Sequence, residues 1–183
     1  KNEDDKYAPF GIRSMFIPDN RIFTKVDKSQ LELRVLAHLS KDERMLAAFN
    51  AGMDFHQDIV KLFNVSRTDA KTFNFSMVFG GSVQTTADNI KSKNLVLVEQ
   101  RMNQWMSLYP GVPKWWKGLT HDALRDGYIT TYGGRKIRLP TEMGEKHVLN
   151  CIKNFPIQAS AAEDVYELML HPEINKYIDI TRL

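Results

Sequence analysis

Four residues that suit phosphate and base binding recur at intervals of four between positions 67 and 79. They are two cations followed by two aromatic residues: Arg67, Lys71, Phe75 and Phe79. In a helix, this spacing spreads them over about 120° of one face and about 18 Å of its length. The dipole at the N-terminus of such a helix adds to the positive end. The order therefore predicts a ligand with phosphates at one end and a flat base at the other.

The same segment carries a second, apolar face, formed by Ala70, Phe73 and Met77. Ser66 and Asp69 resemble a capping box at its start, and Gly80-Gly81 supplies a stop. An ordinary amphipathic helix with a solvated basic turn would share much of this pattern. A plain surface helix would avoid being partly apolar on two faces, which weakens that reading without removing it.

Most of the elements that must position this segment are also predicted to be helices. After a turn at 18–20, β-branched and aromatic residues at 21–26 predict a short strand that ends at Asp27. Apolar residues at helical spacing then predict one helix from Ser29 and others over 42–49, 54–63, 66–80, 96–108, 113–125 and 145–170, the last interrupted by Pro156. Between the last two, segments 128–132 and 135–139 predict a hairpin with a two-glycine turn, Gly133-Gly134, which Pro140 ends.

Composition bounds the class of protein. The 183 residues, 43% of them apolar, suffice for one domain or slightly more with a real core, which excludes bulk disorder. A net charge of +3 leans toward polyanions without establishing one as partner. The single Cys151 excludes a disulfide framework and a thiolate zinc site. The sequence has no apolar run of about 20 residues and no signal peptide. We therefore expect a soluble, intracellular piece, which the missing initiator Met suggests was cut from something longer.

The repeated pattern Arg67-x3-Lys71-x3-Phe75-x3-Phe79-Gly80 resembles motif B, the fingers helix, of the DNA polymerase I-like family A DNA polymerases, whose usual form ends in Tyr-Gly. Residues 27–34, Asp-Lys-Ser-Gln-Leu-Glu-Leu-Arg, resemble motif A of that family. Further agreement follows in family order at 54–56, 109–112, 134–135 with 139–140, and 154–161. The resemblance covers about 11–170. It implies an α/β but mainly helical fold, with part of a polymerase palm and a helical fingers subdomain.

The resemblance assigns a metal site and a selectivity residue to motif A. Asp27 and the backbone carbonyl of Lys28 would bind Mg²⁺, which takes hard oxygen ligands, and the family uses two ions for phosphoryl transfer. Gln30 would contact the incoming dNTP, and Glu32 matches the steric gate that disfavours ribonucleotides. Taken alone, Asp27 would be a helix-capping residue and Glu32 a solvent-facing carboxylate.

The resemblance also assigns the nucleotide contacts. His56, Arg67 and Lys71 match the residues that hold the triphosphate, where guanidinium and ammonium groups suit phosphate oxygens. Arg67 and Lys71 would thereby join Asp27 as catalytic residues. Phe75 would stack near the incoming sugar and base, and Phe rather than Tyr there goes with discrimination against 3′-deoxy chain terminators. A lone His at position 56 would otherwise be an ordinary surface residue.

The expected DNA contacts lie at the end of the motif B segment and in the last helix. Phe79 takes the place of the usual tyrosine beside the templating base, and Gly80 and Ser82 follow it. Asn154 and Gln158 match residues that read the primer–template minor groove, where all four base pairs share acceptors. Read without the resemblance, these two amides would be a polar helix surface beside a Pro kink.

The sequence departs from the family at several points. Lys28 replaces a common aromatic residue, and Asn150 stands where the family often has Arg. Motif C, a His-Asp-Glu hairpin with the second metal-binding aspartate, is absent, because Asp164 and Asp179 lack its flanking residues. We therefore expect a fragment, with palm at 1–50, fingers at 51–145 and a helix returning toward the palm at 146–183.

The implied function is template-directed transfer of a nucleotide from a dNTP to a primer 3′-OH, by a DNA polymerase that serves replication or repair. The expected partners are primer–template DNA, dNTPs and the rest of the polymerase chain, with its thumb and motif C palm, and no membrane. The expected location is the cytoplasm of a bacterial or phage-infected cell, near the nucleoid. Alone, the 183 residues should not polymerise. Two alternatives stay open: a non-catalytic binding module derived from a polymerase, and a relative of single-subunit RNA polymerases, against which Glu32 and Phe75 speak.

Overall fold

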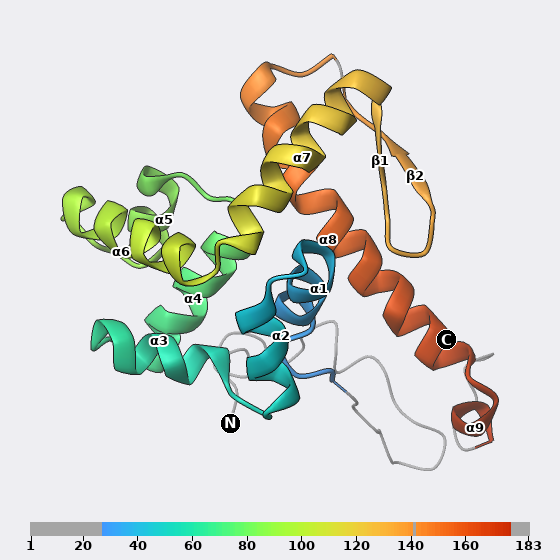
Figure 1. The fold of residues 1–183 in the computed structure, drawn as a ribbon, viewed down its shortest axis with the longest axis horizontal. Helices are drawn as coiled ribbons and strands as arrows, with labels where there is room; N and C mark the ends of the chain where they lie inside the picture. The colour runs from blue at the N-terminus through green and yellow to red at the C-terminus, as the bar shows by residue number, and fades with distance from the viewer. Residues whose placement is uncertain (1–26, 141, 177–183) are drawn as a thin grey trace, which may run out of the picture.

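A computed structural model of the chain describes residues 27–140 and 142–176. It is mainly helical, with one short antiparallel hairpin (Figure 1). In chain order the elements are α1 (Leu31–Ser40), α2 (Glu43–Asn50), α3 (Phe55–Phe63), α4 (Arg67–Val78), α5 (Val83–Asn89), α6 (Leu95–Leu108), α7 (Gly111–Asp126), β1 (Tyr128–Thr130), β2 (Lys136–Arg138), α8 (Glu145–Leu170) and α9 (Pro172–Asn175). The mainly helical fold predicted from the sequence is confirmed. The predicted strand at 21–26 and Asp179 lie outside the described residues.

Polar side chains set where the helices begin. The side chain before the first residue of each of five helices accepts a hydrogen bond from a backbone N–H of the first turn; these residues are Asp42, Asp54, Ser66, Ser82 and Asn94. Such caps satisfy donors that the helix itself leaves unpaired, and each contributes about 1 kcal/mol. The predicted cap at Ser66 is confirmed, since its Oγ accepts from the N–H of Asp69 at 3.0 Å.

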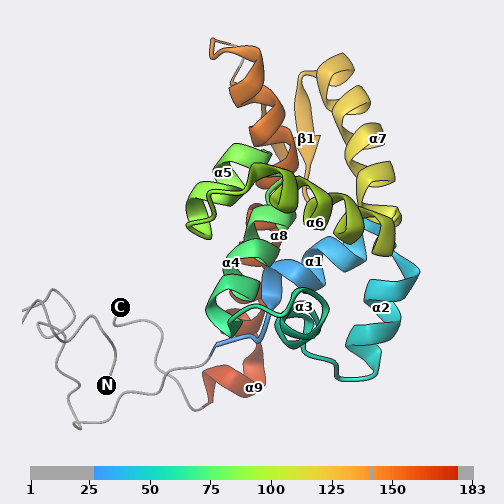
Figure 2. The ribbon, with the colours of Figure 1, turned by 90° about the vertical axis from the view of Figure 1, so that its left-hand side faces the viewer.

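The main hydrophobic core lies between α4 and the helices around it, with most of its residues from α1, α3, α4 and α6 (Figure 2). The predicted apolar face of α4 is confirmed, because Ala70, Phe73 and Met77 are all buried in this core. Trp105 of α6 and Ile157 of α8 complete it from either side. Packing on the apolar face therefore leaves the opposite face of α4 available to hold a ligand.

A second core cluster joins the hairpin to α7 and α8. It consists of Ala123, Ile129, Leu139, Val148 and Ile152. Opposite the core, the carboxylate of Glu163 in α8 accepts hydrogen bonds from the Thr131 hydroxyl, the Gly133 N–H and Arg135 Nε, at 2.8, 3.2 and 2.9 Å. Together with hydrogen bonds from Tyr132 to Ser160 and Glu167, this carboxylate holds the tip of the hairpin against α8.

The hairpin turn differs from the two-glycine turn that the sequence predicts. Ile129 pairs with Ile137, and the N–H of Thr131 donates to the carbonyl of Arg135, which leaves three residues in the loop. Gly134 has φ of +87°, a conformation that glycine adopts without strain, and its N–H donates to the carbonyl of Thr131. A three-residue loop with glycine in the left-handed region is the next most common way to close a hairpin.

Three further features differ from the sequence-based prediction. The predicted interruption at Pro156 is wrong, because α8 is one helix of 26 residues that runs through it. Pro156 removes one backbone donor, but packing in the second cluster before it and of Ile157 in the main core after it keeps the helix continuous. The short helices α5 and α9 were not predicted, since neither has a long apolar period. Among the helices of the described ranges, none is both long and apolar enough to cross a membrane.

Candidate functional site

The four residues at intervals of four lie together along one side of the α4 segment. The side chains of Arg67 and Lys71 are exposed, and Lys71 Nζ lies 5.7 Å from the centre of the Phe75 ring. The rings of Phe75 and Phe79 stack with centroids 6.1 Å apart and planes 21° apart. The row of two cations and two rings, predicted from spacing alone, is therefore present in the structure.

Phe79 belongs to this row although α4 ends one residue earlier. It is the C-cap of α4, and its N–H still donates to the carbonyl of Phe75 at 3.1 Å. Because this helical bond is kept, its ring follows that of Phe75 along the same side. Gly80, with φ of +64°, then turns the chain away. An added Cβ at Gly80 would lie 2.4 Å from Cδ of Lys153, so the side chain of this α8 residue lies against Gly80.

His56, from the first turn of α3, joins the row from the side. Its ring centroid lies 6.1 Å from that of Phe75, and its side chain is buried, with 6% of the residue exposed. Burial lowers the pKa of His56; the carboxylate of Asp54 opposes this, while the charges of Arg67 and Lys71 lower it further. At neutral pH the imidazole is therefore uncharged and can both donate and accept one hydrogen bond.

Arg67 forms an ion pair that the sequence did not predict. Its Nη2 donates to Oδ2 of Asp54 at 2.7 Å, and both side chains are largely exposed. Burial would raise the pKa of Asp54, but hydrogen bonds from Arg67 and from the N–H groups of Gln57 and His56 outweigh it and lower the pKa. Asp54 is thus both the cap of α3 and the counter-ion of Arg67. Spacing along the chain could not predict this ion pair, because the two residues are thirteen positions apart and their contact depends on how α3 packs on α4.

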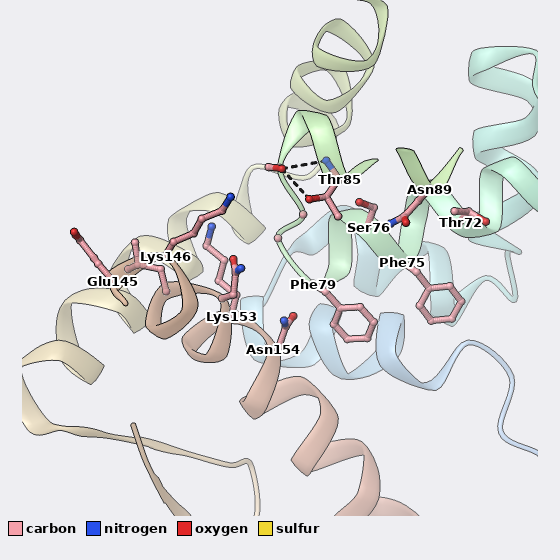
Figure 3. Close-up of a pocket in the computed structure, with 15 residues that line it drawn as sticks. Thr72, Phe75, Ser76, Phe79, Thr85, Asn89, Glu145, Lys146, Lys153 and Asn154 are labelled. Carbon is pink, nitrogen blue, oxygen red and sulfur yellow. Dashed lines mark hydrogen bonds between the residues drawn. The ribbon is translucent and has the colours of Figure 1, made fainter. Parts of the chain in front are cut away.

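A cleft of about 860 Å³ opens between the end of α4, the start of α5 and the first half of α8 (Figure 3). Five of the predicted site residues line it: Phe75, Phe79, Gly80, Ser82 and Asn154. Figure 3 shows the two rings near Asn154, with Lys146 and Lys153 on the other side of that amide. These two lysines were not predicted as site residues. Their separation of seven residues, two turns of one helix, was the available signal.

Glu32 and Gln158 meet Phe79 in a second hollow of about 390 Å³ beside the cleft. These three residues come from α1, α8 and the end of α4, and lie up to 126 positions apart in the chain. Phe79 therefore borders both hollows. Asn154 and Gln158, one turn apart on α8, line different ones: Asn154 lines the larger and Gln158 the smaller.

The motif A residues lie at the start of the described chain. Asp27 is exposed, while Lys28 Nζ donates to Oδ2 of Asp164 in α8 at 2.6 Å. The side-chain oxygen of Gln30 accepts from the N–H of Phe55 at 3.0 Å, so this residue links α1 to α3. Within residues 27–140 and 142–176, no three His, Cys, Asp or Glu side chains gather as they would around a metal ion.

Comparison with known proteins tests the resemblance that the sequence motifs indicate. The sequence model of DNA polymerase family A matches residues 5–178, which is nearly the whole chain. The chain belongs to DNA polymerase family A. The motif-based resemblance is thereby confirmed at the level of the family.

Family A relatives include cellular and phage enzymes. The chain is 32% identical to DNA polymerase I of Geobacillus stearothermophilus over 176 residues, covering 87% of this chain and 20% of that protein. It is 35% identical to the DNA polymerase of Mycobacterium phage L5 over 154 residues, covering 83% and 25%. The chain thus spans about a fifth to a quarter of the length of these relatives.

A solved structure agrees with this family fold. The chain matches the polymerase domain of Pol1 from M. smegmatis, solved with DNA primer–template and dNTP, with a TM-score of 0.69 and 29% sequence identity. The match covers 78% of this chain and 28% of the other. The fold is therefore that of part of a family A polymerase domain.

Proposed function

We propose that this chain is the dNTP- and template-binding part of a DNA-directed DNA polymerase. The reaction is nucleotidyl transfer from a dNTP to a primer 3′-OH. The observation that carries the proposal is the row of two exposed cations and two stacked rings along α4, which ends at a cleft. The relative from M. smegmatis was solved with primer–template and dNTP, which supports the same classes of partner here.

The triphosphate would lie at the N-terminal end of α4. Arg67 and Lys71 are exposed there and carry the charges that phosphate oxygens need, and a charged hydrogen bond contributes about 1.5–3 kcal/mol. His56 adds a donor beside them. The base and sugar would then lie along Phe75 and reach Phe79, the ring next to the cleft. Glu32, beside Phe79 in the smaller hollow, stands where it could crowd the sugar.

Primer–template DNA would occupy the cleft and the adjoining hollow. Asn154 and Gln158 would donate to minor-groove acceptors, one from each hollow. Lys146 and Lys153 place positive charge along the cleft, which suits a phosphate backbone. Gly80 and Ser82 would contact the template strand where α4 ends.

Divalent metal ions, Mg²⁺ in our proposal, fit the motif A residues in part. Asp27 offers an exposed carboxylate and Lys28 a backbone carbonyl, and both are hard oxygen ligands. In this proposal the second carboxylate would come from motif C of the polymerase, as the family resemblance implies. When bound, two such ions stabilise charge on the attacking and leaving oxygens. The residues of this chain would position the triphosphate.

We further propose a division of the chain by role. Residues 1–50 belong to the palm, 51–145 to the fingers, and 146–183 return toward the palm. The thumb and motif C palm would be the intramolecular partners of these parts. Such an enzyme would work in the cytoplasm, at the nucleoid, of a bacterium or a phage-infected cell.

The test is primer extension by the natural full-length protein and its Lys71→Ala variant. We expect template-dependent, Mg²⁺-dependent incorporation of dNTPs. The variant should lose about 10- to 150-fold in kcat/KM, which corresponds to one charged hydrogen bond. We also expect the wild-type protein, with Phe75, to discriminate against dideoxynucleotides. DNA binding without any incorporation would favour the non-catalytic module, and preference for ribonucleotides would favour the RNA polymerase relative. Extension by the 183 residues alone would contradict the need for motif C.

A further inference from the structure

Asn74 of α4 is fully buried and connects three elements through one side-chain amide. Its Oδ1 accepts from Nε1 of Trp105 in α6 at 3.2 Å. Its Nδ2 donates to the carbonyl of Phe55 at 3.2 Å and lies 3.1 Å from Nδ1 of His56. All the hydrogen-bonding atoms of this amide except the second lone pair of its oxygen are thus engaged.

The partners of Asn74 fix its orientation without ambiguity. An indole N–H can only donate, so the atom facing Trp105 must be the amide oxygen. A backbone carbonyl can only accept, so the atom facing Phe55 must be the amide nitrogen. The second hydrogen of that nitrogen is then available for Nδ1 of His56. In consequence Nδ1 must carry a lone pair, and the proton of the neutral ring resides on Nε2.

We propose that Asn74 is a positioning residue for nucleotide binding, which holds His56 in the tautomer that carries its proton on Nε2. This inference rests on the proposed function, in which His56 contacts the triphosphate. A ring with the opposite tautomer would present a lone pair to the phosphate oxygens and repel them. The buried amide therefore decides whether His56 is a donor at the site.

The tautomer matters only while His56 is neutral. Its surroundings keep it so: burial lowers the pKa of His56 most strongly, the carboxylate of Asp54 opposes this, and the charges of Arg67 and Lys71 lower it further. An imidazolium would carry protons on both nitrogens and would need no positioning. Neutrality and a fixed amide are thus both required for the effect.

The Asn74→Asp variant separates positioning from mere packing, because it keeps the size of the side chain and replaces a donor with an acceptor. Its carboxylate would raise the pKa of His56 and, in the neutral ring, would draw the proton to Nδ1. Below the raised pKa, the imidazolium still donates from Nε2, so dNTP binding persists. Above it, the ring presents a lone pair and the donor is lost. We expect the KM for dNTP to rise about 10-fold between about pH 6 and about pH 9 in this variant, beyond any change in wild type.

Three controls make the result decisive in the natural full-length protein. Asn103→Asp, on the exposed part of α6, adds the same charge away from His56 and should leave the pH profile unchanged. In a His56→Gln background, Asn74→Asp should lose its extra pH dependence. Nitrogen NMR of the wild-type protein should report a protonated Nε2 and a bare Nδ1 for His56, a measurement that depends on no variant folding.

The possible outcomes separate the positioning role of Asn74 from the proposed contact between His56 and the nucleotide. If His56→Ala leaves the KM for dNTP unchanged, His56 does not touch the nucleotide and the proposed contact fails. If His56→Ala raises the KM but the NMR spectrum places the proton on Nδ1, the positioning role of Asn74 is overturned while the contact stands. A pH-independent loss in Asn74→Asp also overturns it, because that result describes a packing defect.

Discussion

Under the proposed function, the ion pair between Arg67 and Asp54 would compete with the dNTP for the same guanidinium. Nη2 of Arg67 donates to Oδ2 of Asp54 at 2.7 Å, with 59% of the Arg67 side chain and 38% of the Asp54 side chain exposed. Asp54→Asn removes the negative charge and keeps the cap of α3, because Asn and Asp cap helices about equally well. We therefore expect this variant to bind dNTP more tightly than wild type.

The exposure of the pair sets the size of this effect. Ion pairs between exposed side chains contribute about 0.2–1 kcal/mol, so releasing Arg67 should lower the KM for dNTP by about 1.4- to 5-fold. Salt screens exposed charges, with a Debye length of about 10 Å at 0.1 M ionic strength. The advantage of Asp54→Asn should therefore shrink as salt is raised.

Steady-state primer extension at varied dNTP measures this prediction. Asp58→Asn, one turn further along α3, removes the same charge and serves as the matched control. When Arg67→Ala is added to both proteins, Asp54→Asn should no longer change the KM for dNTP. An increase in KM for Asp54→Asn would refute the reasoning, since it would mean that Asp54 orients Arg67 toward the phosphates.

Three other changes test the cleft and motif A. Phe79→Leu removes one stacking surface and should lower kcat/KM about 5- to 150-fold in primer extension, while Phe79→Tyr, which keeps the ring, should not. Gly80→Ala places a side chain on a residue with left-handed backbone, against Lys153. Calorimetry should show a loss of about 1–2 kcal/mol in the free energy of unfolding, and template binding should weaken. Lys28→Met leaves the half-exposed carboxylate of Asp164 without its cation, and the free energy of unfolding should change by less than about 1 kcal/mol. Adding Asp164→Asn should reverse this change. A larger loss of stability would mean that the ion pair anchors motif A.

The sequence predicted those features that depend on neighbouring residues. The cap at Ser66, the apolar face of α4 and the row ending at Phe79 all follow from spacing within one segment, and each is present in the structure. The hairpin was located correctly but its loop was not, because a register shift of one residue leaves the sequence pattern almost the same. The local effect of a proline inside a helix is unfavourable and so predicts a break, but packing on both sides of Pro156 outweighs that effect and α8 continues through it.

Contacts between elements could not be predicted from spacing. The bond between Asp54 and Arg67 and the amide of Asn74 both depend on how α3 docks on α4. Asn74 lies between Phe73 and Phe75 in the sequence, and only its burial and its hydrogen bond to His56 in the structure point to a role for it. Asp27 and Glu32 remain assigned from the family resemblance.

Pro156 divides the continuous helix α8 into two arms and is the point at which the helix bends most easily. One arm carries Lys146 and Lys153 at the cleft, and the other carries Asp164, which holds Lys28 beside Asp27. From Lys153 to Asp164 the rise along the axis is about 16 Å. Because Pro156 has no backbone N–H, one helical hydrogen bond is missing there, and the direction of one arm can change relative to the other. Bending at Pro156 would therefore let the lysines at the cleft move without displacing Asp164 and the Lys28 that it binds.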